Sequence, residues 1–168
     1  TIGDEGAKEI TASPHIAQLT SLNLRGNKIS EQGAKALAAS PHLGQLNSLD
    51  LSSNEEIGNE GASAIAASPC FAQLTELNLG SNHIRTEGAR AIATSPHLAK
   101  LKELNLGPNH LWEDKTNCIG EEGVKALAAS PLLSQLTSLG LGRNQIGDGG
   151  VKAIAASPHL VKLVELNL

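Results

Sequence analysis

A phrase of eleven residues that recurs along the chain constrains its fold more than any other feature. In its first copy, residues 19–29, the phrase reads L-x-x-L-x-L-x-x-N-x-I. Further copies begin at Leu46, Leu74, Leu101 and Leu136, and a half-copy ends the chain at Leu168. Repetition at a period of about 20–50 residues is typical of proteins in which short units stack side by side. We therefore expect an array of about six similar units.

A second phrase, residues 33–41 in one copy, alternates with the first and predicts a short helix. Ala34, Leu37 and Ala38 have the i, i+3, i+4 spacing that places apolar side chains on one helix face. Because the residue before a proline avoids the α conformation, this helix should end near Ser40. Prolines at the position of Pro41 follow one another at steps of 27, 28, 27, 35 and 27 residues, so each unit contains one such helix.

The leucines of the first phrase predict a β-strand. Leu22 and Leu24 are two residues apart and point to one side, whereas Ser21 and Asn23 point to the other. Parallel strands lie about 4.8 Å apart, but packed helices need about 8–10 Å. The helical side of the stack must therefore be wider than the strand side. This difference predicts an α/β arc with parallel strands on its concave face and short helices on its convex face.

The L-x-x-L-x-L-x-x-N-x-I pattern resembles that of leucine-rich repeat proteins, and the resemblance covers essentially all 168 residues. It is closest to the ribonuclease-inhibitor-like class. The Gly33–Ala38 phrase also resembles the G-A-x-x-L-A motif of GALA-type bacterial repeats. The resemblance implies a right-handed solenoid shaped as a horseshoe arc. GALA-type effectors carry an F-box that has no counterpart here. Ran GTPase-activating proteins also belong to the ribonuclease-inhibitor-like class, but none of their functional residues can be assigned to a position of this sequence.

The repeats predict a single domain, residues 1–168, that starts and ends in mid-repeat and is a fragment of a longer protein. Arrays of this kind normally end in polar capping units. Since neither end shows such a unit, we expect self-association through uncapped ends. A net charge of −4 offers nucleic acid no basic surface. No apolar run reaches the roughly 18 residues that a membrane span requires.

Recurring polar residues are interpreted first as scaffold. The asparagine that follows each strand should satisfy backbone groups in the turn, because its amide both donates and accepts hydrogen bonds. These asparagines are Asn27, Asn54, Asn82, Asn109 and Asn144. The leucines and isoleucines should form buried layers, the first being Leu22, Leu24, Ile29, Leu37 and Leu43. The serine before each proline is interpreted as a helix-terminal residue.

A column of basic residues on the convex face, Lys8, Lys35, Arg90, Lys125 and Lys152, could suggest an anion site. Each has an acidic residue three or four positions earlier in its helix, a spacing that favours ion pairs. The predicted acidic partners are Asp4, Glu31, Glu87, Glu121 and Asp148. We therefore expect a neutralised column and no phosphate binding.

The sequence predicts no metal site, cofactor or enzymatic activity. His15, His42, His97 and His159 occupy equivalent positions in different repeats, so their side chains should run parallel rather than converge on one metal ion. Cys70 and Cys118 lie in different repeats and are expected to be reduced. No serine or cysteine is grouped with a histidine and a carboxylate.

An insertion of eight residues, Leu111–Cys118, interrupts the fourth full repeat and contains the only tryptophan, Trp112. Insertions in repeat proteins form loops that often lie on the binding face, and tryptophan is frequent among interface hot spots. Trp112 could equally pack over its own repeat. Both interpretations remain open at this stage.

The concave face is the predicted binding surface. We expect a protein–protein interaction module that recognises a polypeptide with this face and the insertion; a structural spacer without a ligand is the alternative. The candidate binding residues are Asn23, Arg25, Asp50, Glu76, Asn78, Lys102, Glu103, Asn105, Trp112 and Arg143.

Overall fold

Six α-helices alternate with six strands in the computed structural model, which describes residues 1–54, 56–108 and 117–168. The helices are α1 (Asp4–Ala12), α2 (Glu31–Ala38), α3 (Gly58–Ala67), α4 (Thr86–Ala93), α5 (Gly120–Ala128) and α6 (Gly147–Ala155). The strands are β1 (Ser21–Asn23), β2 (Ser48–Asp50), β3 (Glu76–Asn78), β4 (Glu103–Asn105), β5 (Ser138–Gly140) and β6 (Glu165–Asn167). Short 3-10 turns follow four of the helices at Pro14–Ile16, Pro69–Phe71, Pro96–Leu98 and Pro131–Leu133.

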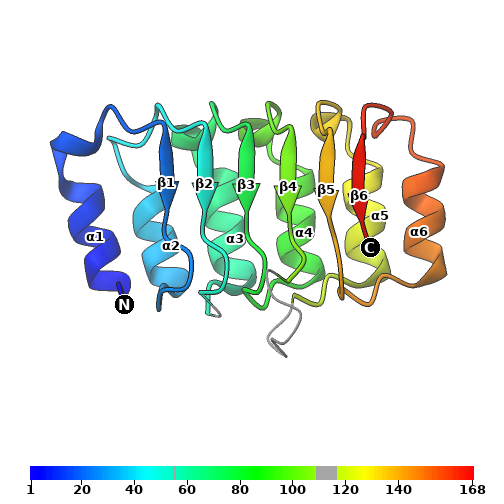
Figure 1. Ribbon diagram of the computed structural model, residues 1–168, viewed down its shortest axis with the longest axis horizontal. Coiled ribbons are helices and arrows are strands. Elements are labelled where there is room, and N and C mark those ends of the chain that lie inside the picture. Colours follow the sequence, from blue (N-terminus) through cyan, green and yellow to red (C-terminus); the bar gives the residue numbers. More distant parts are fainter. Residues whose placement is uncertain (55, 109–116) are drawn as a thin grey trace.

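All six strands form one parallel sheet in the order β1-β2-β3-β4-β5-β6. Leucines pair with leucines across it, as Leu49 does with Leu77 and Leu77 with Leu104. Figure 1 shows the strands side by side in front of the helices, with the row of helices extending beyond the sheet at both ends. The molecule is therefore the predicted α/β solenoid arc, with strands on the concave face and helices on the convex face.

One continuous aliphatic core runs between sheet and helices. In the middle of the array, Leu77 and Leu104 are 2% and 1% exposed, respectively. Phe71 is completely buried at a position where other repeats carry leucine or isoleucine. The predicted first layer is confirmed for Leu24, Ile29, Leu37 and Leu43, whereas Leu22 is only half-buried. It lies in β1, the first strand of the sheet, which is paired on one side only.

Asparagines connect successive repeats through their turns, as predicted for Asn27, Asn54, Asn82 and Asn144, and all of these except Asn27 are buried. The prediction is wrong at the fourth position of this row, where it named Asn109. Asn117 occupies this position instead. Its Oδ1 accepts hydrogen bonds from the backbone N–H groups of Asn82 (3.0 Å) and Ile84 (2.7 Å). Its Nδ2 donates to the carbonyls of Leu79 and Leu106.

The repeat contains two similar phrases, Asn109-His110-Leu111 and Asn117-Cys118-Ile119, of which the second continues the fold. Ile119 is completely buried, and the backbone N–H of Cys118 donates to the carbonyl of Ile84 at 2.8 Å. The boundaries predicted for the insertion, Leu111–Cys118, are therefore wrong at their end, since Asn117 and Cys118 belong to the repeat. Residues 109–116, including Asn109 and Trp112, lie outside the described residues.

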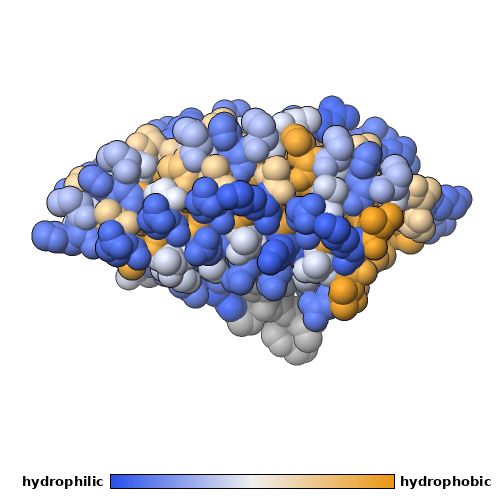
Figure 2. Space-filling model, turned by 90° about the horizontal axis from the view of Figure 1, so that it is seen from above, coloured by the Kyte–Doolittle hydropathy of each residue, from blue (hydrophilic) through white to orange (hydrophobic). Residues whose placement is uncertain are grey.

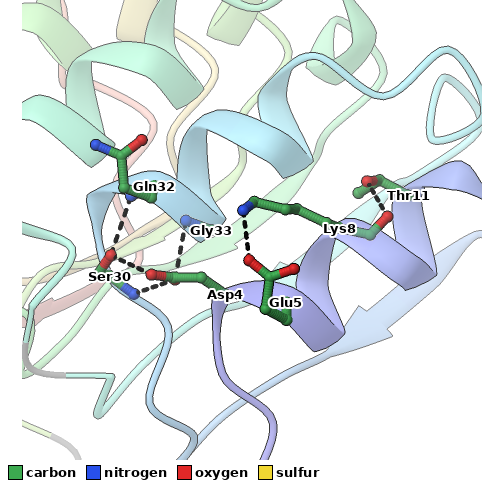
Figure 3. Close-up of polar contacts among 7 residues, drawn as sticks. All are labelled: Asp4, Glu5, Lys8, Thr11, Ser30, Gln32 and Gly33. Carbon is green, nitrogen blue, oxygen red and sulfur yellow. Dashed lines mark hydrogen bonds and ion pairs between the residues drawn. The ribbon is translucent and has the colours of Figure 1, made fainter.

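Side chains also link each helix to its neighbours. The Asp4 carboxylate of α1 accepts hydrogen bonds from the N–H groups of Ser30 (2.8 Å) and Gly33 (2.9 Å) and from Ser30 Oγ (2.6 Å), so it caps the start of α2 (Figure 3). At the other end of the helices, serines before the prolines donate to a carbonyl of the preceding repeat. The donors are Ser40, Ser68, Ser95, Ser130 and Ser157, and the acceptors are Thr11, Ala38, Ala66, Ala93 and Ala128.

Candidate functional site

A groove of about 550 Å³ runs along the concave face. It is lined by Ser48, Leu49, Asp50, Glu76, Leu77, Asn78, Glu103, Leu104, Asn105, Ser138, Leu139, Gly140, Glu165, Leu166 and Asn167. The central leucines of β2 to β5 are at most 2% exposed, so they close the floor of the groove. A ligand would therefore contact mainly the polar side chains that project from the sheet.

The first polar row of the groove is acidic. It consists of Ser48, Glu76, Glu103, Ser138 and Glu165, one residue from each of β2 to β6. Glu76 and Glu103 are direct partners in the parallel register, which places like charges on strands about 4.8 Å apart. Like charges directly opposite each other are destabilising. The row therefore has a negative charge that a cationic ligand would neutralise.

The second polar row consists of Asp50, Asn78, Asn105, Gly140 and Asn167. The Oδ1 atom of Asn78 accepts a hydrogen bond from the N–H of Gly80 at 3.1 Å, and Asn105 makes the same contact with Gly107 at 2.9 Å. Asp50 accepts from both the N–H and the hydroxyl of Ser52. These local bonds hold the side chains in defined positions at the ends of their strands.

The structure brings half of the ten candidate residues together. Asp50, Glu76, Asn78, Glu103 and Asn105 line the groove. Asn23, Arg25, Lys102 and Arg143 are exposed but do not line it, and Trp112 lies outside the described residues.

Gly140 lines the groove although the sequence did not mark it as a candidate. It pairs with Asn105, and a Cβ atom at Gly140 would lie 2.6 Å from Asn105 Oδ1. When the six strand sequences are aligned, Gly140 stands at a position that carries Asn or Asp in the other five strands. This difference could have identified Gly140 from the sequence.

Four residues of the basic column on the convex face, Lys8, Lys35, Arg90 and Lys125, form ion pairs, but only partly with the predicted residues. Lys35 pairs with Glu31 at 3.2 Å, and Lys125 pairs with Glu121 at 2.7 Å, as expected. Lys125 also pairs with Glu122, and its hydrogen bonds to both carboxylates raise its pKa. The hydrogen bond from Lys125 correspondingly lowers the pKa of Glu122.

Two of the predicted ion pairs are wrong. Lys8 pairs with Glu5 at 2.6 Å, because Asp4 is turned toward α2. Arg90 reaches Glu122 of the next helix at 4.0 Å, while Glu87 accepts a hydrogen bond from Asn59. Among the described residues, the column thus combines pairs within helices and pairs between them.

The histidines and cysteines do not form a cluster in the part of the chain that the structure describes. No group of three or more His, Cys, Asp and Glu residues there could hold a metal ion. Cys70 and Cys118 are both free thiols. Burial raises the pKa of the Cys70 thiol, and a hydrogen bond with Ser68 only partly offsets this effect. A raised pKa makes the reactive thiolate form rarer at neutral pH.

A hydrophobic area at the C-terminal end of the array is the other conspicuous surface feature, seen at the right-hand end of Figure 2. Among the residues that the structure describes, the exposed large hydrophobic ones are Val151, Val161, Val164, Leu166 and Leu168. Within the described residues, every helix falls short of the length and hydrophobicity that a membrane crossing requires.

Comparison with solved structures shows the same fold in proteins of low sequence identity. The tropomodulin C-terminal domain from Caenorhabditis elegans has a TM-score of 0.63 at 13% identity, over 92% of this chain and 90% of that one. Leiomodin-1 actin-binding site 2 has a TM-score of 0.52 at 20% identity, over 90% and 85%. An internalin (InlF) from Listeria monocytogenes has a TM-score of 0.58 at 22% identity, over 97% of this chain and 41% of that one.

No curated protein matches the sequence significantly. The family described as Leucine Rich repeat matches residues 17–38, 46–66, 73–93 and 134–155, which make up just over half of the chain. The matched segments include α2, α4, α6 and all of α3 except Ala67. The chain therefore belongs to the leucine-rich repeat family.

Proposed function

We propose that the chain is a protein–protein interaction module that binds an extended polypeptide segment in its concave groove. The observation that carries this proposal is the groove itself, with a closed leucine floor and two rows of projecting polar side chains. Its second row is held in place by local hydrogen bonds, so little side-chain entropy would be lost on binding.

The charge of the groove defines the chemistry of the partner. The described residues that line the groove include four carboxylates, those of Asp50, Glu76, Glu103 and Glu165, and no lysine, arginine or histidine. Complementary charge steers association and suppresses wrong partners. The partner segment therefore carries lysine or arginine side chains that reach the Glu76–Glu103 pair.

A structural relative supports a protein as the class of partner. The leiomodin-1 fragment that shares this fold is named as an actin-binding site. Its 20% identity with this chain supports a polypeptide ligand but does not identify one. Asn23, Arg25, Lys102 and Arg143 remain candidates for contacts beside the groove, and the role of Trp112 stays a prediction.

Binding can be tested with synthetic peptides of equal length and graded net charge, using fluorescence anisotropy. We expect basic peptides to bind and Glu76→Lys to weaken their binding by about tenfold or more, because it places a positive charge in the acidic row. Glu60→Lys is the matched control, since Glu60 is exposed on the helical side and the change in charge is identical.

Two outcomes would contradict the proposal. Equal weakening by Glu60→Lys and Glu76→Lys would indicate an unspecific effect of net charge. If no peptide binds, or if acidic and basic peptides bind alike, the groove is not a site for a basic segment. A complete lack of binding would favour the structural spacer.

We also infer that residues 1–168 form one domain of the ribonuclease-inhibitor-like class with GALA-type features. Support comes from the α-helix of 8 to 10 residues in each of the six described units. The Gly-Ala pair of the motif also has a structural reason. A Cβ atom at Gly61 would lie 3.0 Å from Ala34 Cβ of the preceding helix.

A further inference from the structure

Three lysines lie on the edge of the molecule where the helices lead back to the sheet, beside the concave groove. This edge is at the top of Figure 1 and faces the viewer in Figure 2. It consists of six loops, residues 13–20, 40–47, 68–75, 95–102, 130–137 and 157–164. The loops contain Lys100, Lys102 and Lys162, the edge lysines, but no aspartate or glutamate, although the whole chain has a net charge of −4. The edge is therefore a positive region on an acidic molecule.

Lys100 and Lys162 depart from the repeat, so the periodicity of the array does not account for them. The other four loops carry glutamine at this position, namely Gln18, Gln45, Gln73 and Gln135. The position is exposed in all six loops, so its exposure does not depend on the place of the loop in the array. Three residues later, β4 and β6 begin with Glu103 and Glu165, whereas β1, β2 and β5 begin with serine. The repeats of β4 and β6 thus combine a lysine on the edge with a glutamate in the groove.

The edge lysines do not neutralise these glutamates within the chain. Lys100 Nζ donates a hydrogen bond to Gln73 Oε1 at 2.6 Å, and Lys162 Nζ donates to Gln135 Oε1 at 2.7 Å. Each of these two lysines therefore leans over the preceding repeat and contacts a neutral amide. In the described part of the chain, neither of them forms an ion pair, and Lys102 forms none either. All three are exposed, so an external carboxylate can reach their ammonium groups.

Hydrogen bonds between neighbouring loops hold the backbone of this edge in place. Thr137 Oγ1 donates to the carbonyl of Lys102 at 3.1 Å. Thr75 Oγ1 donates to the carbonyl of Asn47 at 3.2 Å in the same way. Lys102 directly precedes Glu103, so the positive edge adjoins the acidic row of the groove. Two bands of opposite charge therefore run side by side along the array.

We infer that the edge lysines bind acidic side chains of the same polypeptide whose basic side chains enter the groove. This inference rests on the proposed function, because it concerns the partner of that groove. Successive side chains of an extended segment point to opposite sides. A segment that runs across the strands can therefore direct basic residues to the acidic row and the intervening acidic residues to the edge. A purely basic segment fits less well, since it brings like charges next to the edge lysines.

Two peptides of equal length test this pattern by fluorescence anisotropy. In one, lysine alternates with glutamate; in the other, the lysines are the same but glutamine replaces each glutamate. The triple substitution Lys100→Gln, Lys102→Thr and Lys162→Gln gives the edge residues that other loops carry at these positions. We expect it to weaken binding of the lysine–glutamate peptide by about tenfold and to leave the lysine–glutamine peptide bound as well or more tightly.

The matched control removes three positive charges from the helical side. Lys8→Gln, Lys35→Gln and Lys152→Gln change exposed residues and alter the net charge by the same amount. Both triple variants should keep the far-UV circular dichroism of the unaltered chain, because every substituted side chain is exposed. The control is expected to change the binding of the two peptides equally, since its charges lie on the far side of the molecule.

The outcomes separate this inference from the proposed function. If neither peptide binds, or if Glu76→Lys has no effect on binding, the groove is not the site and both proposals are wrong. If the lysine–glutamine peptide binds through Glu76 but the edge variant affects both peptides alike, only the role of the edge lysines is wrong. The same selective loss in the helical-side control would also overturn it, because net charge alone would then explain the loss.

Discussion

A single buried asparagine connects two neighbouring repeats of this array through four hydrogen bonds. Asn117 accepts hydrogen bonds from the N–H groups of Asn82 and Ile84 and donates to the carbonyls of Leu79 and Leu106. The side chain is only 1% exposed, so water cannot replace these bonds when the amide is removed. Asn144 continues the row, because its Nδ2 donates to the carbonyl of Leu106 from the other side.

Asn117→Ala should therefore lower the free energy of unfolding by roughly 3–5 kcal/mol, because it leaves buried backbone groups without partners. Asn109→Ala is the matched control and should change it by less than about 0.5 kcal/mol, because Asn117 already makes the hydrogen bonds of this place in the row. Urea unfolding of both variants measures the difference. The reverse order of effects would restore Asn109 to the row and contradict the position of Asn117.

At the scale of the elements, helices are joined by side chains near both of their ends. Asp4 of α1 caps α2 near their starts, and Ser40 Oγ donates to the carbonyl of Thr11 at 3.1 Å near their ends. Burial alone would raise the pKa of Asp4. The hydrogen bonds from Ser30 and Gly33, with the charge of Lys8, outweigh burial and lower this pKa below its ordinary value. The ionised carboxylate therefore stabilises the pair of helices.

This lowered pKa predicts a pH dependence of stability. The contribution of Asp4 is complete above the pKa of an unfolded aspartate, about 3.9, and is lost as the pH falls through the lower pKa of the folded state. Asp4→Asn keeps an acceptor oxygen but does not titrate. The stability advantage of the unaltered chain over this variant should therefore shrink as the pH falls from about 5 to 2. A difference that stays constant over this range in urea titrations would contradict the role of the ionised carboxylate.

At the scale of the whole molecule, the position of a repeat in the array decides how much its leucines contribute. Leu77 in β3 is 2% exposed, whereas the equivalent Leu166 in β6 is 45% exposed. Neighbouring repeats on both sides cover β3, but β6 is covered on one side only. In repeat arrays, stability is approximately a sum of unit and interface terms.

Leu77→Ala should accordingly lower the free energy of unfolding by about 2–5 kcal/mol, because it leaves a cavity in a closed layer. Leu166→Ala is the same chemical change at the end of the array and should cost less than about 1.5 kcal/mol. Urea unfolding of both variants measures these losses. Equal losses in the two variants would contradict the uncovered position of Leu166.

The sequence by itself determined the architecture. Spacing of the leucines showed which side chains face the core, and the difference in width between strands and helices predicted the concave sheet. The role of the turn asparagines also followed from the chemistry of the amide group. These features depend on the local spacing of residues, which is the same in every repeat. Five groove residues, among them Glu76 and Asn105, could be predicted because alternation along a strand shows which side chains project from the sheet.

Only the tertiary structure decided between partners that are equally near in the sequence. Lys8 could pair with Asp4 or Glu5. It pairs with Glu5, because the Asp4 carboxylate accepts a hydrogen bond from the N–H of Gly33 in α2. Asn109 and Asn117 each precede an apolar residue by two positions, but only Asn117 precedes the isoleucine that leads into α5. Such choices depend on groups about one repeat away in the chain. Periodicity assigns a side chain to a face of the molecule, but the packing of neighbouring repeats selects its hydrogen-bond partner.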